Sequence, residues 1–366
     1  MFDRADLRAA VEADIISADQ ASRLEAFMNR RGDPKASVAA GENLRFLANF
    51  NDVFITIGLV ILTFGLTAVF AQMIIGDFDP DIDGISRAPA LVLMPVAGLM
   101  WVLAEYFCRR RRLLLPSMAL SLIIALYTAL SAAALFGGEE VRSGFRGLPS
   151  LASIGYAFAG GWLAASVAFF VRFRLPFTFL LMALGVAAFA YTAAASSGSI
   201  GMVFGGVLSL MLGLGTLAAG IFFDAKDPER ATRASDNAFW LHLAAAPQII
   251  MGLRGLVSGY ALNSSAVSEN AEAIVLLAAL IGFGALSLAL NRRALIVSGL
   301  ITFAVALGVL VSNVGGDPLT SFMLTAVILG GGVVLLGGGW RTARRALLTV
   351  LPRQGVAARI FPPEPA

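Results

Sequence analysis

The chain has 366 residues, of which 58% are hydrophobic and 14% are charged, and its formal net charge is +3. Soluble globular domains carry about 25% charged residues. This composition, with a mean hydropathy of +0.81, therefore excludes an ordinary soluble fold. A single cysteine, Cys108, excludes an intrachain disulfide. We expect a chain that lies in a membrane.

The first segment, residues 1–51, is predicted to be a cytoplasmic helix pair with a juxtamembrane stretch. Apolar residues recur at helical spacing within residues 3–31. Ser17 and Gln20 fit a capping box, in which two side chains satisfy backbone N–H groups reciprocally. Residues 1–35 hold six basic and seven acidic residues, so they lack the basic surface that nucleic-acid binding requires. We expect this segment to dock a membrane-protein partner or to self-associate, and we expect no nucleic acid.

Residues 52–339 are predicted to form an all-α transmembrane bundle of ten helices. A bilayer core about 30 Å thick requires roughly 20 apolar residues per helix, and continuous apolar runs of that length favour helices over the alternating strands of a barrel. The ten predicted spans cover residues 53–75, 89–107, 113–136, 151–171, 175–195, 200–223, 238–261, 271–290, 294–312 and 320–339.

The basic residues agree with this count. Cytoplasmic loops of membrane proteins are enriched in Lys and Arg. With the N-terminus inside, the inner segments hold 23 of the 27 basic residues, the outer loops hold three, and Arg254 lies within a span. One missed or invented span would invert every later loop, so the sequence predicts that both termini are cytoplasmic and that the lipid bilayer is the main partner.

The loop after the first span is acidic and raises the possibility of a cation site. Asp79, Asp81 and Asp83, followed by Gly84, match the first positions of a calcium-binding loop. The twelfth position should be a bidentate Glu, but it is Ala90. Two interpretations remain open, a weak outer calcium site and a solvated acidic turn.

The inner end of the second span carries two polar features. Glu105 lies four residues before Arg109, so an ion pair along the helix explains the carboxylate. Cys108 is either a palmitoylation site or an ordinary residue at the apolar boundary.

Two further ionisable residues lie within the seventh span, where such residues are functional candidates by default. His242 is interpreted as a hydrogen-bonded residue near the headgroups or as a proton relay. Arg254 is interpreted as an anchor that reaches toward the surface, or as a buried residue that recognises an anion or a lipid headgroup. An outer carboxylate could meet Arg254, and Glu272 is the candidate.

Glycines cluster in two spans, and small residues at four-residue spacing let membrane helices approach closely. No strand, Lys or Ser/Thr partner supports a phosphate loop there, so we expect these glycines to serve helix packing. They are Gly201, Gly205, Gly206, Gly213, Gly215 and Gly220 in the sixth span, and Gly330–Gly332 and Gly337–Gly339 in the tenth.

The tail, residues 340–366, is predicted to begin as a basic amphipathic helix on the anionic inner leaflet. Arg341, Arg344 and Arg345 would bind the membrane surface there. The alternative is that these residues only anchor the tenth span.

Three stretches resemble a family of predicted bacterial multi-spanning inner-membrane proteins of unknown function with a short N-terminal helical segment. They are EADIISADQASRL, GENLRFLANFNDVFITIGLVIL and DNAFWLHLAAAP. The resemblance implies an inner-membrane location and no assigned activity.

Enzymatic function is not expected. Hydrolytic or metal chemistry requires clusters of His, Asp, Glu or Cys, and a single histidine excludes a zinc site with two histidines. No cofactor is predicted. Two functions remain open: a scaffold or envelope-assembly subunit, and a carrier for a small metabolite or lipid with five-plus-five inverted halves.

Overall fold

The computed structural model describes residues 50–75, 82–142, 148–198, 201–227, 232–263, 269–290 and 317–349, together with the single positions Ala13, Ser17, Gln20, Leu307 and Val311. The chain divides into two compact units, and Leu44–Pro362 forms the larger one. Near several gaps only the backbone of a helix is described. This applies to Asp83, Glu272 and Arg341.

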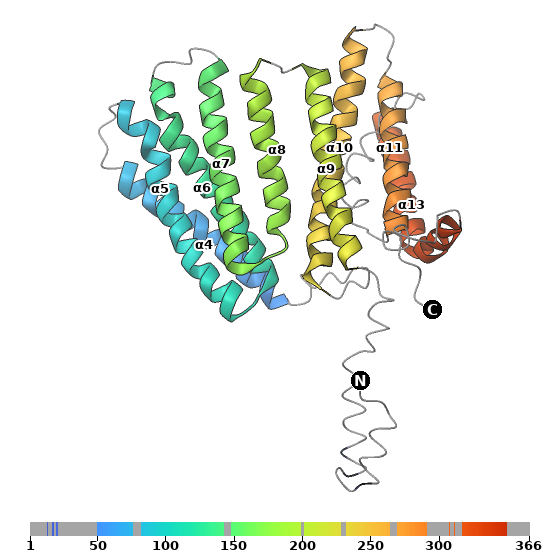
Figure 1. Ribbon diagram of the computed structural model, residues 1–366, viewed down its shortest axis with the longest axis horizontal. Helices are drawn as coiled ribbons and strands as arrows, with labels where there is room; N and C mark the ends of the chain where they lie inside the picture. The colour runs from blue at the N-terminus through green and yellow to red at the C-terminus, as the bar shows by residue number, and fades with distance from the viewer. Residues whose placement is uncertain are drawn as a thin grey trace. The chain divides into compact units, whose positions relative to one another are not determined.

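The described part of the larger unit is helical and contains no strand. Figure 1 shows its helices following one another as neighbours along the chain. They are α4 (Phe50–Ile75), α5 (Ile82–Ala104) with its π-helical extension η2 (Glu105–Arg110), α6 (Leu114–Arg142), α7 (Leu148–Phe173), α8 (Thr178–Ser196), α9 (Met202–Lys226), α10 (Arg233–Asn263), α11 (Glu269–Leu290) and α13 (Pro318–Leu348).

Nine of the ten predicted spans coincide with these helices, and the span predicted over 294–312 lies outside the described residues apart from Leu307 and Val311. Among the described residues, six helices are long and apolar enough to cross a membrane: α4, α5 with η2, α6, α7, α8 and α9. The prediction of an all-α membrane bundle is confirmed at this level. Ten spans and cytoplasmic termini stay predictions.

Helix α10 is long but is not among the six. Its 31 residues include Asp236, His242, Gln248 and Arg254, and these polar side chains lower its hydropathy. Both His242 and Gln248 are buried, so much of the polarity of α10 is turned away from the surface of the bundle.

Helices α4 to α8 pack around one core of large side chains. Met100, Leu120, Phe169 and Leu181 are fully buried in it, and the ring of Phe169 packs on Trp101 and Phe173. Polar side chains tie the helices where they meet. Thr67 on α4 hydrogen-bonds Tyr127 on α6 at 2.9 Å, and Trp162 Nε1 on α7 donates to the Leu181 carbonyl on α8 at 2.7 Å.

The outward faces of the helices are strongly apolar. Large hydrophobic side chains are more than two-thirds exposed on several helices, including Phe64 on α4, Phe136 on α6 and Leu335 on α13. A soluble protein rarely leaves so much contiguous apolar surface in water, so the natural surroundings of these faces are lipid.

Helix α13 extends beyond the predicted end of the tenth span. It is continuous from Pro318 to Leu348, so the basic segment that begins at residue 340 belongs to this helix and does not start a new one. At its beginning, Asp317 is the N-cap residue, and hydrogen bonding to Thr320 holds the pKa of this carboxyl below its usual range.

The predicted capping box near the N-terminus is confirmed. Ser17 N donates to Gln20 Oε1 at 2.9 Å, and Gln20 N donates to Ser17 Oγ at 3.2 Å. The rest of the predicted helix pair, apart from the single position Ala13, lies outside the described residues.

Candidate functional site: a buried histidine–aspartate pair between α9 and α10

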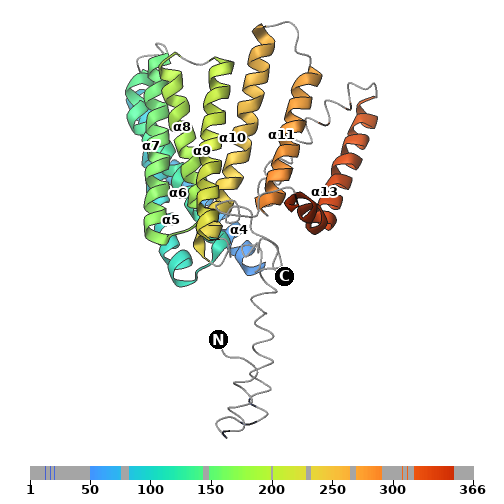
Figure 2. The same ribbon diagram turned by 45° about the vertical axis from the view of Figure 1, so that its right-hand side comes forward.

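Helices α9 and α10 meet along a seam of glycines. Gly206, Gly213 and Gly220 follow one another at seven-residue intervals on α9, and a Cβ atom at any of them would come within 2.6 Å or less of α10. Figure 2 shows the two helices side by side. A seven-residue period is that of a left-handed, coiled-coil-like crossing.

The partners along the seam show that the two helices are antiparallel. Gly206 faces Leu256, Gly213 faces Ile249, and Gly220 faces His242, so the numbers fall along α10 as they rise along α9. We therefore define the α9–α10 seam by these three glycines and the α10 residues that they face.

The glycine prediction is confirmed in part. Three of the glycines expected in the sixth span make the seam, but at seven-residue rather than four-residue spacing. In the described part of the chain, no neighbouring helix comes within 4 Å of a Cβ built at the others, which are Gly201, Gly205 and Gly215 of the sixth span and Gly330, Gly331, Gly332, Gly338 and Gly339 of the tenth.

Close approach lets backbone groups of one helix reach side chains of the other. Ser209 Oγ on α9 donates to the Gln248 carbonyl on α10 at 2.8 Å. Pro247 has no N–H to donate within α10, and the neighbouring side-chain amide of Gln248 donates to the Ala244 carbonyl at 3.0 Å. The seam is thus both tightly packed and internally hydrogen-bonded.

The candidate site is the pair formed by His242 and Asp224 at one end of this seam. His242 has no exposed surface, and its Nε2 lies 3.0 Å from Oδ2 of Asp224. The ring is not aligned for a hydrogen bond across that distance, so the contact is electrostatic. Gly220 leaves room for the ring, because a Cβ there would lie 2.1 Å from Nδ1.

Buried ionisable groups are costly unless they are paired, and in a membrane they mark functional positions by default. The Nδ1 atom of His242 is buried and has no hydrogen-bond partner among the described residues. A carboxylate beside an imidazole can hold a proton or pass it on. This is the chemistry that the pair offers.

Hydrogen bonds link the end of α9 to the start of α10. Asp227 Oδ2 accepts hydrogen bonds from Thr232 N at 2.8 Å and from Thr232 Oγ1 at 2.7 Å. Thr232 Oγ1 in turn accepts from Ala234 N at 3.2 Å, which caps the start of α10. The pair therefore lies near the point where the two helix ends are joined by hydrogen bonds.

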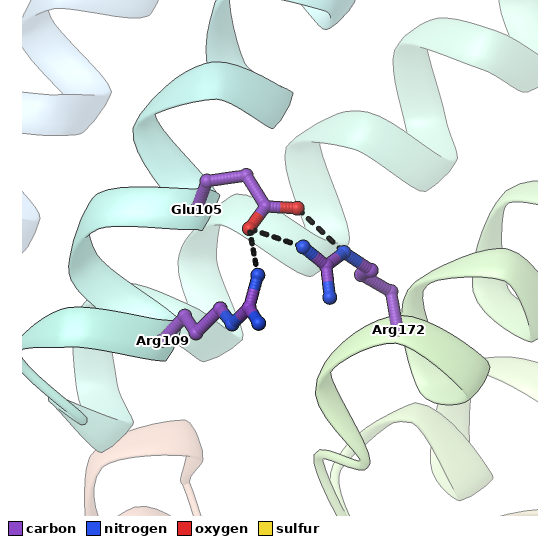
Figure 3. A network of polar contacts seen from close by, with 3 residues as sticks. All are labelled: Glu105, Arg109 and Arg172. Atoms are coloured by element: carbon purple, nitrogen blue, oxygen red, sulfur yellow. Dashed lines mark hydrogen bonds and ion pairs between the residues drawn. The ribbon is translucent and has the colours of Figure 1, made fainter.

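A second polar cluster lies at the end of α5. Glu105 forms a bidentate ion pair with Arg172 of α7, with N–O distances of 2.7 and 2.8 Å, and its Oε2 is 3.8 Å from Arg109 Nη1 (Figure 3). The predicted Glu105–Arg109 pair is confirmed, but the stronger partner comes from another helix. All three side chains are partly exposed.

The headgroup role of Arg254, His242 and Glu272 stays a prediction. His242 is buried against α9, where Gly220 leaves space for its ring. Arg254 is exposed, so these two residues share no surface. The side chain of Glu272, in the first turn of α11, lies outside the described residues.

Sequence reasoning missed Asp224 because the sixth span was predicted to end at residue 223. The helix continues to Lys226 and carries the carboxylate with it. A signal was present, since Gly220 and Asp224 are one helical turn apart in the sequence and therefore lie on the same face.

Arg344, predicted to bind the membrane surface, is 3% exposed, and its Nε donates to the Leu288 carbonyl of α11 at 3.1 Å. This contact joins α13 to α11. Arg345 is exposed, whereas the side chain of Arg341 and the acidic cluster of Asp79, Asp81 and Asp83 lie outside the described residues.

No protein-family model, no curated protein and no solved structure matches this chain.

Proposed function

We propose that this chain is a non-enzymatic, multi-pass scaffold or assembly subunit of the inner (plasma) membrane, with both termini in the cytoplasm. In this account the membrane bundle is a rigid anchor, and the N-terminal segment recruits a membrane-protein partner. The family resemblance stated above is part of the same proposal.

The observation that supports a scaffold is how the polar side chains are used. Four of the contacts described above join two helices: Thr67 to Tyr127, Glu105 to Arg172, Trp162 to the Leu181 carbonyl, and Arg344 to the Leu288 carbonyl. Interhelical polar contacts of this kind hold membrane helices together. The glycine seam adds backbone contact, and both features favour a bundle that keeps one shape.

The test is co-purification of the full chain in mild detergent, followed by native mass spectrometry. We expect a protein partner at fixed stoichiometry with the wild type. It should be lost in the double variant Leu24→Asp/Phe27→Asp, which replaces apolar side chains of the N-terminal segment by carboxylates. The control Ala13→Asp adds a carboxylate to the same segment at an exposed position and should keep the partner. A wild-type chain that purifies without any protein partner would contradict the scaffold.

A carrier is the second candidate, and the His242–Asp224 pair is the observation that favours it. Protonation of a buried pair changes the charge inside the bundle, which is one way to couple transport to a proton gradient. A carrier predicts that the wild type retains a small molecule in native mass spectrometry and that Asp224→Asn changes the pH at which it is released. If the wild type and Asp224→Asn release the ligand at the same pH, the His242–Asp224 pair does not couple transport to protons.

A further inference from the structure

Six arginines lie at the ends of η2 and α7, which the ion pair of Glu105 and Arg172 brings together. Arg109 and Arg110 end η2, and Arg111 and Arg112 form the turn to α6. Arg172 lies in the last turn of α7, and Arg174 follows it in the turn to α8. All six side chains are exposed. The bidentate bond between Arg172 and Glu105 joins the two turns (Figure 3).

Few carboxylates of the described residues balance the positive charge of this cluster. Glu105 is the one carboxylate that meets it in the described part of the chain, and Arg110, Arg112 and Arg174 form no ion pair there. Helices α6 and α8 begin beside Arg112 and Arg174, and neither has an acidic residue in its first turn. The positive ends of their dipoles therefore add to the charge of the guanidinium groups.

The turn between α9 and α10 is different, although it also carries basic residues. Asp227 accepts two hydrogen bonds from Thr232, and Asp236 lies in the first turn of α10. Each basic residue there thus has an acidic residue near it in the chain, Asp227 next to Lys226 and Asp236 three residues after Arg233. The arginine cluster, defined as Arg109–Arg112 with Arg172 and Arg174, lacks such compensation and is suited to an anion from outside the chain.

The surroundings of the cluster place it at the depth of lipid headgroups. The apolar stretch of α5 and η2 ends at Arg110, and Tyr106 is 40% exposed at the same level. Exposed tyrosines of membrane helices favour the interface between acyl chains and headgroups. Tyr106 Oη accepts a hydrogen bond from Arg111 Nε at 3.2 Å, so aromatic ring and guanidinium are positioned together.

Several arginines are held in place before any ligand arrives. Arg172 is fixed by Glu105 and Arg111 by Tyr106, while Arg112 and Arg174 have φ angles of 53° and 52°. Residues other than glycine seldom adopt this left-handed conformation, and it concentrates at functional positions. Here it occurs in the short turns that follow η2 and α7.

We propose that the arginine cluster binds the phosphate of an anionic phospholipid headgroup. Guanidinium groups bind phosphate through paired, charge-assisted hydrogen bonds, and basic sites between membrane helices on the cytoplasmic side select anionic headgroups. The site depends on membrane embedding and goes beyond the scaffold and carrier proposals, which it neither requires nor supports.

The test is native mass spectrometry of the full chain in mild detergent, titrated with phosphatidylglycerol or phosphatidylcholine. We expect the wild type to bind phosphatidylglycerol at least tenfold more tightly than phosphatidylcholine. The double variant Arg110→Gln/Arg174→Gln should lose about tenfold in affinity for phosphatidylglycerol. The matched control, Lys226→Gln/Arg233→Gln, removes the same charge from the turn between α9 and α10 and should lose less than twofold.

Three results would overturn the site. If the two double variants lose the same affinity for phosphatidylglycerol, the effect comes from net charge alone. If the wild type binds the two lipids equally, the cluster does not select a headgroup. If inorganic phosphate displaces phosphatidylglycerol at equal concentration, the cluster is a site for soluble anions and not for a lipid headgroup. The wild-type lipid preference keeps the proposal testable if the double variant fails to fold.

Discussion

Helices α4 to α8 and the α9–α10 pair reach close packing by opposite means. The first group fills the space between its helices with large side chains such as Met100 and Phe169. The second removes side chains, so that glycines of α9 lie against the backbone of α10. Large side chains fill the first region, whereas in the second the missing side chains of glycines let the two helices come close.

The difference teaches where ionisable groups can be placed. In the α4–α8 region the ion pair of Glu105 and Arg172 lies at the rim and is partly exposed. In the α9–α10 seam the glycine at position 220 lets His242 be fully buried beside Asp224. At position 220 the missing side chain leaves room for the imidazole ring, whereas the Glu105–Arg172 pair lies where both side chains stay partly exposed.

The largest expected effect comes from emptying the α4–α8 core. Phe169→Ala should lower the free energy of unfolding by about 4 kcal/mol, because the ring is fully buried and the cavity will not collapse completely. Thermal unfolding in detergent measures this. Val171→Ala is the control, since Val171 is 69% exposed on the same helix, and an equal loss in both variants would contradict the assigned core.

Breaking the buried pair should have the next largest effect. Asp224→Ala removes the carboxylate that lies 3.0 Å from His242 and should cost about 3 kcal/mol, because a buried group then loses its partner. The double variant Asp224→Ala/His242→Ala should cost less than the sum of the two single variants. Strict additivity in the thermal unfolding series would show that the two residues do not interact.

Filling the seam should have an intermediate effect. Gly206→Ala should cost about 2 kcal/mol, because its Cβ would lie 2.6 Å from the backbone nitrogen of Leu256 and the helices must separate. The same change at Gly215 on the same helix meets nothing within 4 Å. If both variants unfold at the temperature of the wild type, α9 and α10 are not in backbone contact.

The smallest effect is expected at the rim. Glu105→Gln should cost less than about 1 kcal/mol, because the ion pair is partly exposed and screened by solvent. The loss of stability in this variant should be smaller still in high salt. A salt-independent loss larger than that of Asp224→Ala would reverse the proposed contrast between a rim pair and a buried pair.

Most of the helix positions could be predicted from the sequence, because span length and continuous apolarity are local properties. Contacts between helices are not local. The sequence placed Arg109 beside Glu105 at helical spacing, but Arg172 is 67 residues away and meets Glu105 only after α5 and α7 are in place.

The same limit applies to the site residues. Arg344 has the charge and position predicted for a membrane anchor, yet its side chain donates to the Leu288 carbonyl of α11. Asp224 stood one residue beyond a predicted span end, where hydropathy falls and helix boundaries are least certain. Burial of His242 depends on the absence of a Cβ at Gly220, which a pattern of apolar residues does not reveal.

The central claim is that these helices cross a membrane with the arginine-bearing turns inside, and the two ends of α8 test it directly. In a Cys108→Ser background, Arg174→Cys and Ser197→Cys place single thiols just before and just after this helix, at exposed positions. Intact cells are treated with a membrane-impermeant maleimide, before and after permeabilisation. The account predicts that Ser197→Cys reacts in intact cells and that Arg174→Cys reacts only once the membrane is opened. Equal reaction of both in intact cells, or the reverse order, would contradict it.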